Sequence, residues 1–171
     1  MPESNISAAM REAVGRELSR RVAFPVSESD IRRWAIAVYF PAEPPRLFWD
    51  VDYAKSTRHG GIVAPEDFNP FAWMVAEKGV SMADGDGGQD RVEHGLGIDG
   101  PGLANQLNGG LEVVYGIPMR PGDVVTSTTR LVGYSERAGR LGLMLFTTTE
   151  DTWTNGDGGV VKKTRMTLIR Y

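Results

Sequence analysis

The short stretch HGGIVAPEDFN, residues 59–69, contains the residue types from which acid/base chemistry is built. His59 and Asp67 would supply an imidazole and a carboxylate, the usual pair for moving protons to and from one water molecule. Pro65 can open a helix, whose amino end attracts an anion or a carbonyl oxygen. An alternative interpretation is structural, because Gly60 and Gly61 permit a tight turn and acidic residues favour a helix amino terminus.

Other kinds of site are poorly supported by the composition. The sequence has no cysteine, which excludes disulfides, thiolate nucleophiles and cysteine-rich zinc sites. Its only histidines are His59 and His94, so a three-histidine metal site is impossible, and we predict neither a metal nor a cofactor. His94 lies among glycines and is expected to be a solvated loop residue.

Charge and hydropathy narrow the range of partners. The formal net charge of -3 and an isoelectric point near 5.4 do not favour nucleic acid. The run WAIAVYF, residues 34–40, is too short for a membrane span, which needs about 20 apolar residues. No apolar stretch of signal-peptide length opens the sequence. We therefore expect a cytoplasmic protein, and 171 residues suit one domain.

The first half of the sequence predicts helices. Apolar residues four apart predict a leading helix over 6–20, within a leading segment 1–25. Ser27 is a good cap for a second helix, with a buried stripe of Ile31, Trp34, Ala35 and Val38. A third helix is expected over 65–80.

The second half predicts a sheet. The glycine-rich segment 81–104 has too little apolar content to fold alone and is expected to be a mobile loop. Four strand-like runs follow, separated by turn signals: 111–119, 124–134, 141–153 and 160–171. Helices followed by an antiparallel meander predict an α+β fold, with residues 26–171 forming the main domain.

Three motifs carry a family resemblance: HGGIVAP before an apolar segment, NGGLEVVYGIPMRPGDVV, and the hairpin TNGDGG. From about residue 26 to 171 the chain resembles the amino-terminal, fatty-acid-synthase-type dehydratase domain of MaoC-like hydratases and dehydratases. The resemblance implies a single hotdog domain, a long central helix wrapped by a curved antiparallel sheet. It also implies an acyl-thioester tunnel between two such units, and reversible hydration of an enoyl thioester to an (R)-3-hydroxyacyl thioester, carried by coenzyme A or an acyl carrier protein. The expected substrate-binding residues are Gly61, Ile62, Val63, Ala64 and Asn69.

The family's catalytic loop, Asp-x-Asn-Pro-x-His after the first amphipathic helix, is not matched here. The corresponding stretch is FPAEPPRLFWDVDYA, residues 40–54. Phe48 stands at the position of the imidazole, and Pro44-Pro45 replaces Asn-Pro. Glu43 is a nearby candidate acid or base, but an offset of one or two residues would aim it elsewhere. The alternative is a packed loop anchored by Phe48 and Trp49.

Several functions remain open on the sequence. The chain is expected to be the noncatalytic subunit of an enoyl-thioester hydratase, in a heterodimer or heterotetramer with a catalytic MaoC-like subunit. Alternatives are a homodimeric hydratase or thioesterase using His59 and Asp67, and an acyl-thioester binding protein without turnover.

Overall fold

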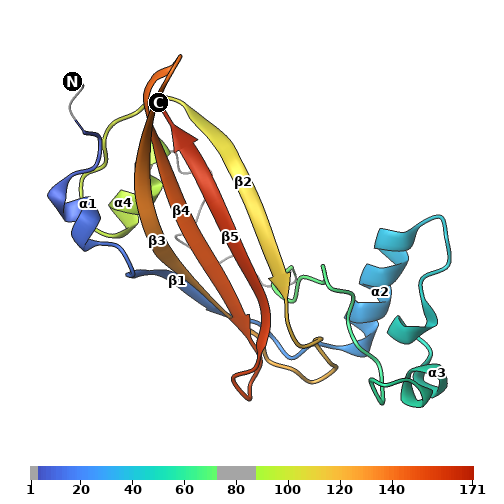
Figure 1. The fold of residues 1–171 in the computed structure, drawn as a ribbon. Helices are drawn as coiled ribbons and strands as arrows, with labels where there is room; N and C mark the ends of the chain where they lie inside the picture. Colours follow the sequence, from blue (N-terminus) through green and yellow to red (C-terminus); the bar gives the residue numbers. More distant parts are fainter. Residues whose placement is uncertain (1–3, 73–87) are drawn as a thin grey trace.

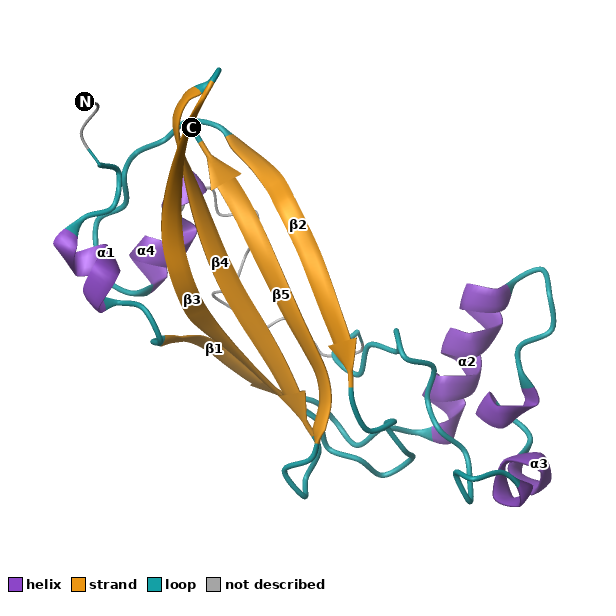
Figure 2. Cartoon of the chain, viewed as in Figure 1, coloured by secondary structure: helices purple, strands orange, loops and turns teal. Residues whose placement is uncertain are grey.

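The computed structural model describes residues 4–72 and 88–171, which build one five-stranded antiparallel sheet with short helices at its two ends (Figures 1 and 2). The strand order is β1-β3-β4-β5-β2, so β1 and β2 are the edges. The strands are β1 Glu17–Val22, β2 Gln106–Tyr115, β3 Thr126–Gly139, β4 Gly142–Thr154 and β5 Val160–Arg170. The four strands expected from the second half are confirmed, as is the α+β class. The expected meander is wrong for the first of them, because β2 pairs with β5 and not with β3.

Helices gather at opposite ends of the sheet. Helices α1 (Ala8–Glu12) and α4 (Arg91–Gly95) lie near one end, whereas α2 (Glu28–Tyr39) and α3 (Val51–Ser56) lie beyond the other (Figure 1). We refer to residues 27–58 as the helical arm. No helix in the described ranges is long and apolar enough to cross a membrane.

The leading helix is shorter than the sequence predicts. Its first turn is capped as a helix should be, because the Ser7 hydroxyl accepts a hydrogen bond from the Met10 amide. The helix ends at Glu12, and Gly15 then takes a positive φ of 89° that reverses the chain. Glu17–Val22 forms β1 against β3. Hydrogen bonds with the distant strand β3 therefore outweigh the helical preference that the spacing of apolar residues over 6–20 indicates.

Helix α2 follows the prediction at its start and departs from it at its end. The Ser27 hydroxyl accepts from the Asp30 amide, as the expected cap does. Ile31 and Ala35 are completely buried, whereas Val38, on the same stripe, is 57% exposed. The apolar stripe therefore extends beyond the core of this chain.

The central helix expected over 65–80 falls largely outside the described residues. Residues 65–72 form turns, and residues 73–80 are among those not described. The Asn69 side chain accepts a hydrogen bond from the Phe71 amide, a local bond that competes with helical pairing. Phe68 and Phe71 are nevertheless buried.

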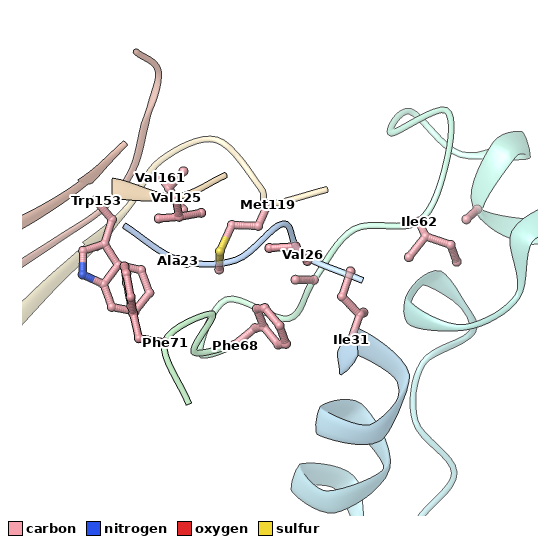
Figure 3. Packing of buried hydrophobic residues seen from close by; sticks show 12 residues of the cluster. Ala23, Val26, Ile31, Ile62, Phe68, Phe71, Met119, Val125, Trp153 and Val161 are labelled. Carbon is pink, nitrogen blue, oxygen red and sulfur yellow. The ribbon is translucent and has the colours of Figure 1, made fainter. Parts of the chain in front are cut away.

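A buried apolar cluster joins the helical arm to the sheet (Figure 3). Phe71 meets Trp153 of β4 edge to face, with ring centroids 5.1 Å apart. Ile31 brings α2 into the same cluster, and Phe68 brings the segment before residue 72. Each such large side chain contributes about 1.5–3 kcal/mol on full burial, which makes this cluster the main attachment of the arm.

The described part of the glycine-rich segment is anchored, in contrast to the expected mobile loop. Arg170 on β5 is 1% exposed and donates to Glu93 of α4 at 2.8 Å and to Asp90 at 2.7 Å. Tyr134 also donates to Glu93, at 2.7 Å. Burial alone would raise the pKa of Glu93, but the hydrogen bonds from Arg170 and Tyr134 outweigh it and hold that pKa below its ordinary value.

Removing the Arg170 side chain should therefore lower the free energy of unfolding far more than removing a surface arginine. We expect Arg170→Met to lower the free energy of unfolding by about 3–5 kcal/mol, because two carboxylates lose their buried counterion. The matched control is Arg165→Met on the same strand, whose ion pair with Glu150 is half exposed. That variant should lose about 0–1 kcal/mol. Urea unfolding followed by circular dichroism measures both, and equal losses would contradict the anchoring role.

Candidate functional site

A pocket of about 390 Å³ lies between α2, the turn Arg46–Phe48 and the loop 58–67. Most of its lining residues are apolar, and four polar residues from the loop also line it. The apolar lining residues are Trp34, Val38, Tyr39, Leu47, Phe48, Val63, Ala64, Pro65 and Pro118. The polar ones are Arg58, His59, Glu66 and Asp67. This composition suits a ligand with an apolar body and one polar end.

A second pocket of about 150 Å³ adjoins the first. The two have in common the lining residues Arg58, His59, Ala64, Pro65, Glu66 and Pro118. The second pocket adds Tyr115, Gly116 and Ile117, at the carboxyl end of β2. The loop 58–66 therefore borders both pockets and connects the helical arm with the sheet edge.

Local backbone geometry fixes this loop. The Ala64 amide donates to the Met119 carbonyl at 2.9 Å, which ties the loop to the segment after β2. The buried side chain of Ile62 packs into the cluster of Figure 3. Gly60 adopts a φ of 67°, so the turn before the loop favours a glycine.

The expected substrate-binding residues divide into two groups. Val63 and Ala64 line the larger pocket. Gly61, Ile62 and Asn69 do not line either of these two pockets: Ile62 is in the core, and the Asn69 side chain caps its own turn. All five are close in the sequence, but the larger pocket is lined by the consecutive residues 63–67 and not by Gly61, Ile62 or Asn69.

His59 and Asp67 line the same pocket, yet each is engaged elsewhere. The Nε atom of Arg58 donates to Nε2 of His59 at 3.3 Å. The hydroxyl of Tyr115 donates to Oδ1 of Asp67. Within residues 4–72 and 88–171, no hydrogen bond or ion pair joins a histidine to a carboxylate. The part of the chain that the structure describes also has no cluster of three metal-ligating side chains.

Tyr115 was not identified from the sequence. Its hydrogen bond to Asp67, reinforced by partial burial and by the negative charge of that carboxylate, raises the tyrosine pKa to about 12. The two residues are 48 positions apart, and no local pattern links them. The sequence places Tyr115 only in the middle of the expected strand 111–119, whereas β2 in the structure ends at this residue.

The stretch that replaces the family's catalytic loop is occupied by structural contacts. Phe48 is partly buried against the core and lies 6.1 Å from the ring of Tyr39. Trp49 donates its indole proton to the Pro44 carbonyl at 2.9 Å. Asp50 accepts from the Tyr53 amide and from Arg46, so it caps α3. Packing and capping therefore account for this stretch.

Glu43, the remaining candidate in that stretch, is exposed. It does not line either of the two pockets beside the loop 58–67. The structure thus gives Glu43 no contact with the other candidate acid/base residues.

The Tyr115–Asp67 contact can be tested by titration. In Asp67→Asn the carboxylate is lost, so we expect the tyrosine pKa to fall from about 12 toward its ordinary value near 10. Glu66→Gln is the matched control, because Glu66 acts on Tyr115 only through its charge and should change the pKa less. Carbon-13 NMR of labelled tyrosine rings follows the titration. An unchanged Tyr115 pKa in Asp67→Asn would show that the hydrogen bond does not form.

Comparison with solved structures shows the hotdog fold of MaoC-like dehydratases. The chain is 21% identical to a chain of the ChsH1-ChsH2 complex from Mycobacterium tuberculosis, with a TM-score of 0.67, covering 96% of this chain and 88% of that one. A MaoC-like dehydratase from Rhodospirillum rubrum is 18% identical, with a TM-score of 0.57 and coverage of 93% and 92%. A chain of the HadBC (3R-hydroxyacyl-ACP dehydratase) complex from Mycobacterium tuberculosis is 19% identical, with a TM-score of 0.53, covering 91% of this chain and 99% of that one.

The sequence itself was compared with curated proteins and with family models. No curated protein matches it significantly. The family model described as the FAS1-like dehydratase domain region matches residues 12–164, most of the chain. Because this match covers more than half of the sequence, the chain belongs to the FAS1-like dehydratase domain family.

Proposed function

We propose that this chain is the noncatalytic subunit of an (R)-specific enoyl-thioester hydratase or 3-hydroxyacyl-thioester dehydratase, and that it completes the acyl tunnel of a catalytic hotdog partner. The observation that carries the proposal is the contact set of the candidate site. His59 and Asp67 are bound to Arg58 and Tyr115, rather than to each other.

The chemistry explains why these contacts matter. Hydration adds water at the β carbon of the enoyl group and a proton at the α carbon, so an acid and a base must face one water molecule. The Nε2 atom of His59 accepts a hydrogen bond from Arg58, so it is not paired with a carboxylate. Asp67 holds the hydroxyl of a tyrosine instead of orienting an imidazole. Both residues are better suited to bordering the tunnel.

The two sheet edges support a partner on one side. Strand β1 is short and carries Glu17, Arg20 and Arg21, the charged composition that keeps an edge unpaired. Strand β2 has ten residues with a single charged side chain, Glu112, and Leu111 on it is 58% exposed. The edge of β2 is therefore the one suited to strand pairing with another subunit.

The comparisons support a particular kind of partner protein. Two of the similar structures are complexes, ChsH1-ChsH2 and HadBC, and the second is a 3R-hydroxyacyl-ACP dehydratase. By analogy we expect a hotdog partner and an acyl thioester substrate, bound to coenzyme A or carrier protein. The proposed reaction moves only water, so it requires no redox cofactor, and we expect it in the cytoplasm.

Activity of the separated and combined subunits tests the proposal. The purified chain alone should hydrate enoyl-coenzyme A at a negligible rate, because general acid/base catalysis typically supplies about 100- to 10,000-fold per group. Adding a catalytic MaoC-like subunit from the same genome should give turnover, measured by loss of enoyl absorbance.

Substitutions in the pocket then distinguish tunnel residues from catalytic ones. In the complex, His59→Ala and Asp67→Ala should change KM or chain-length preference and leave kcat within about tenfold. Glu43→Ala, outside the two pockets, is the control. If the chain alone were active and lost about 100-fold or more in kcat on replacing His59 or Asp67, the homodimeric hydratase or thioesterase would be the correct function. A complex without turnover would favour a binding protein.

A further inference from the structure

The hydrogen bond between Tyr115 and Asp67 joins the two pockets of the candidate site. Asp67 lines the larger pocket and not the smaller one, whereas Tyr115 lines the smaller pocket and not the larger one. The hydroxyl of Tyr115 donates to Oδ1 of Asp67. Six other residues line both pockets, so the two spaces adjoin. The bond between Tyr115 and Asp67 therefore lies at the border between them.

The smaller pocket has the size and the lining of an extension of the larger one. Ligand pockets measure about 300–1,000 Å³. The larger pocket, at about 390 Å³, is in this range, and the smaller, at about 150 Å³, is too small for a site of its own. Ala64, Met119 and Val161 line the smaller pocket and belong to the buried cluster of Figure 3. Such an apolar lining suits the end of an acyl chain rather than a charged group.

We propose that Tyr115 and Asp67 determine the acyl chain length that the site accepts. While their hydrogen bond is intact, the acyl group is confined to the larger pocket, and opening the bond adds the smaller pocket. This inference rests on the proposed function and assigns a specificity role to two residues of that site. Both residues act on the fit of the substrate and take no part in the chemical step.

The other contacts of the two residues allow the bond to open while its surroundings stay folded. The Nζ atom of Lys162 lies 5.8 Å from the ring centroid of Tyr115 and 4.5 Å from that of Trp153, so the tyrosine ring has a separate contact on the sheet. Asp67 belongs to the turns of residues 65–72 and is exposed. The bond to Asp67 raises the pKa of Tyr115 to about 12, so the hydroxyl stays protonated and able to donate at neutral pH.

Removing the hydroxyl should shift the length preference toward longer acyl groups. In Tyr115→Phe the ring stays and the bond to Asp67 is lost. Each additional buried methylene tightens binding about fourfold. We therefore expect affinity for an acyl group two methylenes longer than the preferred one to rise about tenfold relative to the preferred one.

Two further variants test whether the effect comes from the bond itself. Asp67→Ala should shift the preference in the same direction. The double variant Tyr115→Phe/Asp67→Ala should shift it no further than the larger of the two single shifts, because all three variants lose the same bond. The matched control is Tyr53→Phe, which removes a tyrosine hydroxyl outside both linings and should keep the preference of the unsubstituted chain.

Calorimetry with saturated acyl-coenzyme A thioesters of increasing chain length measures this preference without turnover. The chain is titrated alone and together with a catalytic MaoC-like subunit from the same genome, and circular dichroism checks that each variant folds. If the bond limits chain length, long thioesters bind more tightly to Tyr115→Phe and short ones bind about as before. A bond that only stabilises the loop would, when lost, weaken the binding of all lengths in parallel, and that result overturns the inference.

The outcomes separate this inference from the proposed function. If the unsubstituted chain binds no acyl thioester, alone or with the MaoC-like subunit, both fail. If thioesters bind but the complex has no turnover, the proposed function fails and the length series still tests the role of the bond. An unchanged length preference in Tyr115→Phe and Asp67→Ala overturns the inference. Additive shifts in the double variant also overturn it, because the two residues would then act independently.

Discussion

The hydrogen bond from the Ala64 amide to the Met119 carbonyl holds the two halves of the site in place. On one side of it, the loop 58–67 returns from the helical arm. On the other, the chain leaves β2 toward β3. Phe68 and Val125 pack around this junction in the same buried cluster, which excludes water from the bond and strengthens it. Both pockets, and therefore the positions of His59 and Asp67, depend on this one crossing.

Local signals in the sequence were sufficient for much of the fold. The Ser27 cap and the four long strands are indicated by residues close together in the chain, and the structure confirms them. The turn expected over 136–140 is wrong, because β3 continues through Gly139. Strand β1 could not be predicted in this way, because its partner, β3, begins more than 100 residues later. The anchoring of α4 was missed for the same reason, since Arg170 and Glu93 are 77 residues apart.

The candidate site shows the same division between local and distant information. The loop with His59 and Asp67 could be identified because its residue types are close together in the sequence. Val63 and Ala64 of the same loop line the larger pocket, as expected of substrate-binding residues. The side chains that contact His59 and Asp67 could not be predicted from the sequence. Arg58 is next to His59 in the sequence, but the sequence does not show that its side chain turns toward the imidazole. Tyr115 comes from a strand that is distant in the sequence. Residue types indicate which reactions a site could catalyse, and the contacts of those residues then exclude some of these reactions.

The unequal edges of the sheet have a consequence for stoichiometry. A sheet that could accept strands at both edges would grow without limit, as in fibrils, because each added subunit would present a new open edge. Here the outer edge is β1, whose six residues include three charged side chains. If a neighbour pairs with β2 as proposed, the charged side chains of β1 would disfavour strand pairing at the remaining edge. Such an assembly would then stop at a finite size.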